Sequence, residues 1–154
     1  MQFKLSNPIR VFDLDEFLPA DGESRFALNF SEGTFAVDIF YEKDDSSGEF
    51  VRTLRFGVAR SFFKTPFPGH SFFQCEEDRN VALLNSVVHY EHSDFSALDG
   101  SVGYKHYRLF LHSVGAAIHV IAKSFSITDP VALHWCSGTA GSRLVPAKPH
   151  FLLG

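Results

Sequence analysis

The sequence predicts an α+β fold that is rich in β-strand, either a single antiparallel sheet or a sandwich, with one or two short helices. Hydrophobic and polar residues alternate over two segments, near 24–59 and near 104–125, which is typical of half-buried hairpins. Phenylalanine, which favours strands, occurs eighteen times in the 154 residues. We expect one globular domain over 1–136 and an irregular tail over 137–154, where Gly and Pro interrupt the pattern.

In the first hairpin, alternate residues of each strand are expected to face inward on both sides of a polar turn. Phe26, Leu28 and Phe30 are followed by Phe35, Val37, Ile39 and Tyr41, and, after the turn, by Phe50, Leu54, Phe56 and Val58. The turn is predicted at 43–48, a run of charged residues, serines and a glycine. The residues that alternate with these are expected to face outward.

The middle of the chain is predicted to alternate short helices with a strand. A helical turn is expected at 78–84, where Asp78 could cap the first turn, and a β-branched and aromatic strand at 86–92. A second helical turn is expected at 93–98, capped by Ser93 and stopped by Gly100.

The second hairpin is expected to turn at 113–116 and to separate its side chains into two sets. Tyr107, Leu109 and Leu111 would face the core with Ile118, Val120 and Ala122. The opposite face would carry His106, Arg108, Phe110, His112, Ala117, His119, Ile121 and Lys123. The basic and aromatic residues of this second set predict a cationic surface with an aromatic centre, suited to an acidic protein partner. The alternative is an ordinary solvated face, or one that a helix covers.

A segment at 61–73 combines five phenylalanines with two prolines and a glycine, which predicts a loop. Its rings would either form a lid on the core or contact a partner. The candidate partner residues here are Phe63, Phe67, His70 and Phe72. Phe67, held between the two prolines, is the first choice for an exposed anchor.

The histidines are the candidate residues for metal binding and catalysis. His112 and His119 are expected to lie diagonally across the second hairpin, but Arg108 and Lys123 on the same face oppose a cation, so we predict no metal and no cofactor. His89 with Glu91, and His134 with Cys136, are spaced for acid–base or nucleophilic chemistry, yet no known catalytic motif surrounds them.

Composition sets the expected compartment and partners. The net charge of −4 is distributed unevenly, with eleven acids and four bases in residues 1–50 but one acid and five bases in 103–154. The basic density is too low for nucleic-acid binding, and no apolar run reaches the roughly 18 residues that span a bilayer. Two cysteines and no signal sequence predict a cytoplasmic protein with free thiols.

These observations predict a non-enzymatic protein-binding module, for example an immunity- or inhibitor-type protein, and allow a homodimer. The alternative is an enzyme or small-ligand-binding domain with a Phe-lined pocket and a histidine acid or base. A concave pocket that holds one of the histidines would favour the alternative.

Overall fold

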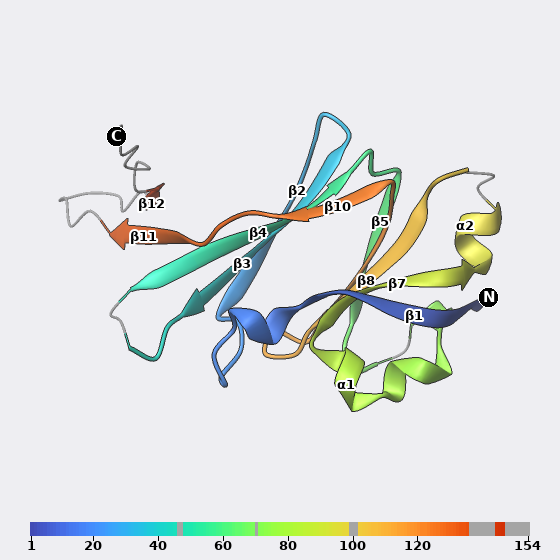
Figure 1. The fold of residues 1–154 in the computed structure, drawn as a ribbon, viewed down its shortest axis with the longest axis horizontal. Coiled ribbons are helices and arrows are strands. Elements are labelled where there is room, and N and C mark those ends of the chain that lie inside the picture. The colour runs from blue at the N-terminus through green and yellow to red at the C-terminus, as the bar shows by residue number, and fades with distance from the viewer. Residues whose placement is uncertain (46–47, 70, 99–101, 136–143, 147–154) are drawn as a thin grey trace.

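A computed structural model describes residues 1–45, 48–69, 71–98, 102–135 and 144–146 (Figure 1). Its elements, in chain order, are β1 (Phe3–Asp13), the 3-10 helix η1 (Leu14–Glu16), β2 (Arg25–Ser31), β3 (Thr34–Glu42), β4 (Glu49–Gly57), β5 (Ser61–Pro66), β6 (Phe73–Gln74), the 3-10 helix η2 (Glu76–Arg79), α1 (Val81–Leu84), β7 (Ser86–Ser93), α2 (Asp94–Leu98), β8 (Lys105–Leu111), β9 (Ala116–Ala122), β10 (Ser124–Ile127), β11 (Val131–Trp135) and β12 (Leu144–Pro146). The predicted β-rich α+β fold is confirmed.

The strands form two sheets that pack as a sandwich (Figure 1). The first sheet has the order β5-β9-β8-β7-β1-β6, and the second has the order β12-β11-β4-β3-β2 with β10 also paired to β4. The chain passes from one sheet to the other between β9 and β10, where the backbone N–H of Lys123 donates to the carbonyl of Gly57 at 3.0 Å. Both predicted hairpins are present, as β2–β3–β4 and as β8–β9.

An apolar core fills the space between the sheets. The second sheet contributes Phe35, Val37, Ile39, Leu54 and Phe56, and the first contributes Val87, Tyr107, Leu109, Leu111, Ala116, Ile118, Val120 and Ala122. The predicted inward parity of both hairpins is therefore correct for these residues. Val58 and Phe30 depart from it: the φ of Val58 is +51° and its side chain is 54% exposed, and Phe30 is 52% exposed.

The first sheet curls, so that its two edge strands approach each other. The rings of Phe63 on β5 and Phe73 on β6 lie 5.6 Å apart, although four strands separate β5 from β6 in the sheet. A second core, with Leu5, Phe73, Val88 and Tyr90 at its centre, fills the concave side, and Leu83 of α1 and Phe95 of α2 pack against it. The first sheet is thus covered by protein on both faces.

The predicted helical turns are present, with one change of cap. Asn80, and not Asp78, caps α1, because its side chain accepts the backbone N–H of Ala82 at 3.1 Å. Ser93 caps α2 as predicted, with its Oγ accepting the N–H of Ser96 at 3.2 Å.

Strand β1 was not predicted, because its residues do not alternate in polarity. It pairs in antiparallel fashion with β7 and in parallel with β6. The left-handed backbone at Asn7 (φ 53°) and a bulge between Arg10 and Phe12 interrupt the regular pleat. The strand is therefore stabilised by its pairing with β6 and β7, and no local sequence pattern predicts it.

The expectation of a loop over the whole of 61–73 is wrong for its first half, since β5 pairs with β9 over Ser61–Pro66. Proline is tolerated there because it is the last residue of an edge strand. The next residue, Phe67, donates its N–H to the carbonyl of Gly115 at 3.0 Å. Gly115 sits in the β8–β9 turn with φ +63°, a conformation that favours glycine.

Most of the predicted tail at 137–154 lies outside the described residues. Its described part, β12, pairs with β11. Within the part of the chain that the structure describes, no helix has the length and apolar character needed to cross a membrane.

Candidate functional site

The concave face of the first sheet carries polar side chains that are buried. His106, Arg108 and His119 expose 1%, 0% and 3% of their surface. The expected cationic surface is therefore corrected: these residues and Phe110 do share one face, as predicted, but β6, η2, α1 and α2 cover it, which is closer to the alternative of a covered face. Their direct contact with a partner would require the cover to open.

Two histidines and a serine form a hydrogen-bonded chain across this face. Ser93 Oγ lies 2.8 Å from His106 Nδ1, and His106 Nε2 lies 3.0 Å from His119 Nδ1. The predicted neighbour of His119 was His112, which is wrong by two residues of register. Leu111 pairs with Ala116, so that His106 becomes the diagonal neighbour of His119.

Burial keeps both imidazoles neutral. Desolvation lowers the pKa of His106 to about 3. Desolvation also lowers the pKa of His119 well below its usual value, with the nearby His106 and Arg108 acting in the same direction.

Arg108 holds the covering segment to the sheet. Its guanidinium pairs with Asp78 of η2 at 2.5 Å, and it also donates to the carbonyls of Leu83 at 3.1 Å and Ser86 at 3.3 Å. The hydroxyl of Tyr90 accepts from Arg108 Nε at 3.3 Å and donates to Asp78 at 2.6 Å. Every polar group of this cluster has a partner, so we assign it a structural role.

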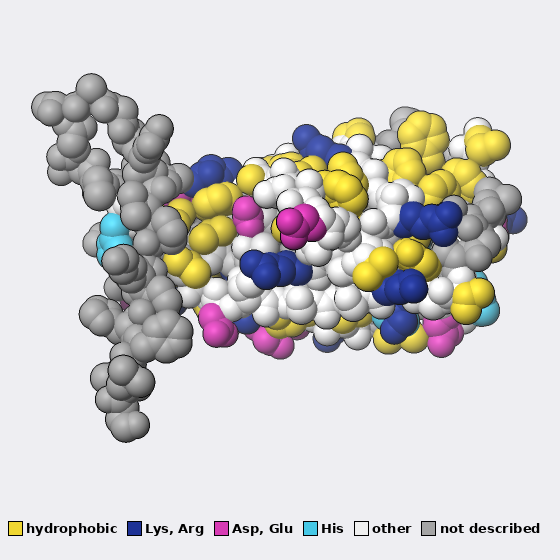
Figure 2. Space-filling model, turned by 90° about the horizontal axis from the view of Figure 1, so that it is seen from above, with side chains coloured by type: hydrophobic (Ala, Val, Ile, Leu, Met, Phe, Trp, Pro, Cys, Tyr) yellow, Lys and Arg dark blue, Asp and Glu magenta, His cyan; other side chains and the backbone are white. Residues whose placement is uncertain are grey.

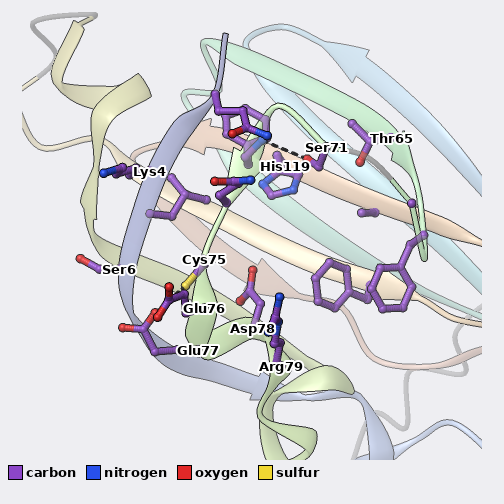
Figure 3. A pocket seen from close by; sticks show the side chains of 18 of the residues that line it. Lys4, Ser6, Thr65, Ser71, Cys75, Glu76, Glu77, Asp78, Arg79 and His119 are labelled. Atoms are coloured by element: carbon purple, nitrogen blue, oxygen red, sulfur yellow. Dashed lines mark hydrogen bonds between the residues drawn. The ribbon is translucent and has the colours of Figure 1, made fainter.

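A cavity of about 1160 Å³ opens above this face, and His119 lies in its wall (Figure 3). We name it the His119 groove; its lining includes Leu5, Thr65, Pro66, Phe67, Phe73, Cys75, Glu76, Glu77, Asp78, Phe110, Ala117 and His119. In Figure 3, His119 lies between Thr65 on one side and Cys75 and Asp78 on the other.

Aromatic rings frame His119. Phe73 stacks on it with centroids 4.3 Å apart, and Phe67 stacks on Phe110 at 4.1 Å. The exposed His112 meets the Phe67 ring edge-on at 4.9 Å. Phe67 is half-buried by these contacts, so it is not the most exposed ring of its segment.

The other rings of 61–73 divide between cover and surface. Phe63 packs in the second core, whereas Phe72 is 62% and Phe62 is 43% exposed. His70 lies outside the described residues. Both the lid and the exposed rings that the sequence allowed are therefore present.

The rim opposite Phe67 is acidic and carries a thiol. The Cys75 thiol donates to Glu77 at 3.1 Å, and desolvation, followed by that hydrogen bond, raises the pKa of Cys75 to about 12. Such a thiol is a poor nucleophile. The bond to Cys75 also lowers the pKa of Glu77.

The remaining candidates do not join the groove. Desolvation lowers the pKa of the half-buried His89, and its neighbour Glu91 accepts from Asn7 at 3.2 Å. Lys123 is exposed, with its ammonium 5.2 Å from the ring of Tyr104. Cys136, the proposed partner of His134, lies outside the described residues.

Among the described residues, no three His, Cys, Asp or Glu side chains are grouped so as to hold a metal. No family model, no curated protein and no solved structure matches this chain. No sequence pattern marks Ser93, Asp78 or Tyr90 as site residues, because their partners lie 12 to 30 positions away on other elements. The one usable pattern is the alternation along β7, which places Tyr90 on the same buried side as Val88.

Proposed function

We propose that this protein binds a small, largely apolar molecule in the His119 groove. The single observation that carries the proposal is the position of a buried, neutral histidine in the wall of a cavity, beside the stacked rings of Phe67 and Phe110. Concave sites lined by aromatic residues with a few placed polar groups are the usual form of small-molecule sites. The alternative reading of the sequence is thereby favoured over a protein-binding module.

The dimensions and chemistry of the groove support a small ligand. Its volume is slightly above the roughly 300–1,000 Å³ of typical ligand sites. Phe67, Phe73, Phe110 and Ala117 offer apolar contact, and the Arg108 charge beneath them is taken up by Asp78. A largely apolar ligand therefore meets no unpaired charge from Arg108, although Lys4, Glu76, Glu77, Arg79 and Asp94 also line the groove.

The polar chain beneath the groove supports a role beyond folding. Apolar side chains could fill a covered sheet face without the cost of burying Ser93, His106 and His119. Polar residues buried in a constellation next to a cavity are more common where a site needs them.

Titration with toluene tests this proposal by amide NMR. We expect shifts at the residues that line the groove, with a dissociation constant on the order of 1 mM for so small a probe. The variant Ala117→Leu places a larger side chain in the groove and should abolish the shifts. The matched control, Ala27→Leu on the exposed side of β2, should leave them unchanged. Shifts spread over both sheets, or equal in the two variants, would reject the groove as the site.

A protein partner remains a second candidate, because apolar side chains are exposed where the edges of the two sheets meet. Phe30 on β2 and Phe62 on β5 lie 6.1 Å apart and are 52% and 43% exposed, and Val58 nearby in sequence is 54% exposed. Figure 2 views the molecule from the side on which β2 and β5 lie in Figure 1, and shows hydrophobic side chains interspersed with Lys and Arg and with some Asp and Glu. That mixture would suit an acidic protein partner or a second copy in a homodimer.

Affinity capture from cytoplasm, the compartment we propose, tests the second candidate. The pair Phe30→Ser with Phe62→Ser should lose a partner that the wild type retains. Val81→Ser is the control, because Val81 is 80% exposed on α1, away from that edge. Identical capture by both variants would reject the edge as an interface.

A further inference from the structure

We propose that His119 presents an Nε2–H donor to the groove, fixed in that tautomer by Ser93 through His106, and that the ligand therefore carries an uncharged acceptor such as a carbonyl oxygen on a flat apolar body. This inference rests on the proposed function and names its ligand class. It follows from the direction of each hydrogen bond in the chain.

The direction is set at Ser93. Its Oγ already accepts the N–H of Ser96 at 3.2 Å, as the cap of α2. Ser93 is buried, so its hydroxyl hydrogen needs an acceptor, and His106 Nδ1 lies 2.8 Å from Oγ. Ser93 therefore donates, and His106 Nδ1 carries no hydrogen.

The same donor-to-acceptor direction continues through the two imidazole rings. A neutral His106 without hydrogen on Nδ1 carries it on Nε2, which donates to His119 Nδ1 at 3.0 Å. His119 then accepts at Nδ1 and carries its own hydrogen on Nε2, across the ring. Because His119 lines the groove, that N–H is the donor the chain offers to a ligand.

The surroundings favour an uncharged acceptor over a carboxylate. Arg108 makes four hydrogen bonds, to Asp78, Tyr90 and two carbonyls, and it does not line the groove, so it offers a ligand no second donor. Four acids (Glu76, Glu77, Asp78 and Asp94) and two bases (Lys4 and Arg79) line the groove, so its net negative charge disfavours an anion. A carbonyl oxygen needs one donor, whereas a carboxylate needs several, and the lining adds to His119 the buried hydroxyl of Thr65, which has no hydrogen-bond partner among the described residues.

The tautomer is measurable in the free protein by ¹⁵N NMR of the imidazole rings at pH 7.5. We expect the hydrogen of His119 on Nε2. In the variant Ser93→Ala, the hydroxyl is lost and the preference of both rings should weaken or reverse, although Ser93 is a positioning residue that touches no ligand. A hydrogen on Nδ1 of His119 in the wild type would overturn the proposal before any ligand is added.

Binding then compares acetophenone, which has a carbonyl, with ethylbenzene, which has a similar shape and no acceptor. We expect the wild type to bind acetophenone about two- to ten-fold more tightly, as one hydrogen bond provides. The preference should vanish in His119→Phe and fall in Ser93→Ala, while ethylbenzene binding stays within about two-fold. Benzoate should bind more weakly than acetophenone.

The outcomes separate this inference from the groove itself. Equal binding of acetophenone and ethylbenzene in the groove would overturn the donor and leave the proposed function intact. Tighter binding of benzoate would overturn the uncharged ligand class. Failure of all three probes and of toluene to bind would reject both proposals.

Discussion

The two faces of the β8–β9 hairpin belong to two different cores. Toward the second sheet, Leu109, Ile118 and their neighbours pack only against other apolar side chains. On the concave side, His106, Arg108 and His119 are equally buried but make directed hydrogen bonds. Alternate residues of the same strands thus build one core by packing alone and another by satisfying polar groups.

The difference matters for function because only the polar core borders a cavity. The apolar core is closed by two sheets, whereas the concave side is covered by short elements between β6 and α2. A cover made of short segments leaves the His119 groove between the Phe67 side and the Cys75 side. The second core therefore both stabilises the fold and borders a groove that a ligand can enter, whereas the first core only stabilises the fold.

The largest expected effect is from breaking the buried ion pair. Asp78→Ala should lower the free energy of unfolding by about 3–5 kcal/mol, because it leaves the charge of Arg108 buried without its partner. Urea denaturation measures the loss. The control, Glu49→Ala, removes the partner of the 44% exposed Arg25 and should cost about 1 kcal/mol or less. Similar losses in the two variants would contradict the structural role of Asp78.

A cavity in the apolar core should lower the free energy of unfolding by a similar or smaller amount, and this loss should not depend on pH. Leu109→Ala removes a fully buried side chain and should lower the free energy of unfolding by about 2–5 kcal/mol. We expect the same loss at pH 7 and at pH 5.5, because the substitution removes no contact with a titratable group. A loss that changed with pH would show that the two cores are coupled.

The smallest effect, counted for one histidine and one pH unit, is the pH dependence of the polar core. Since folding lowers the pKa values of His106 and His119, the unfolded chain binds protons that the folded one rejects. Their contribution is complete above about pH 6.5 and is lost as the pH falls from there, by up to roughly 1.4 kcal/mol per pH unit for each histidine. For His106 the loss extends to about pH 3. The variant with His106→Phe and His119→Phe should show a shallower slope between pH 6.5 and 5. An unchanged slope would assign the acid sensitivity to other groups.

The sequence predicts the first core well and the second poorly, for a physical reason. Alternation along a strand identifies the residues that share a face, so Tyr107, Leu109 and Leu111 could be placed inward together. It cannot say what covers the opposite face, because that depends on where β6 and the short helices return. His106 and His119 were thus placed on the correct face but expected in solvent.

Register is the other limit. The predicted turn at 113–116 lies one residue too far along the chain, which shifts the strand pairing by two residues and would make His112 the neighbour of His119. The observed pairing of Leu111 with Ala116 makes His106 that neighbour. Strand β1 left no periodic signal at all, and its place depends on β7 and β6. Contacts between distant elements, such as Asp78 with Arg108, have no local signature.

The most direct test of the account is the protonation state of His106 and His119 in the folded protein, read from their ring ¹⁵N shifts as the pH is lowered from 7.5 to 5.5. We expect both rings to stay neutral over this range, because burial holds the pKa of His106 near 3 and that of His119 well below its usual value. Protonation of either ring near pH 6.5 while the fold is intact would show that water reaches the concave face, and would contradict a buried hydrogen-bonded chain beneath the groove.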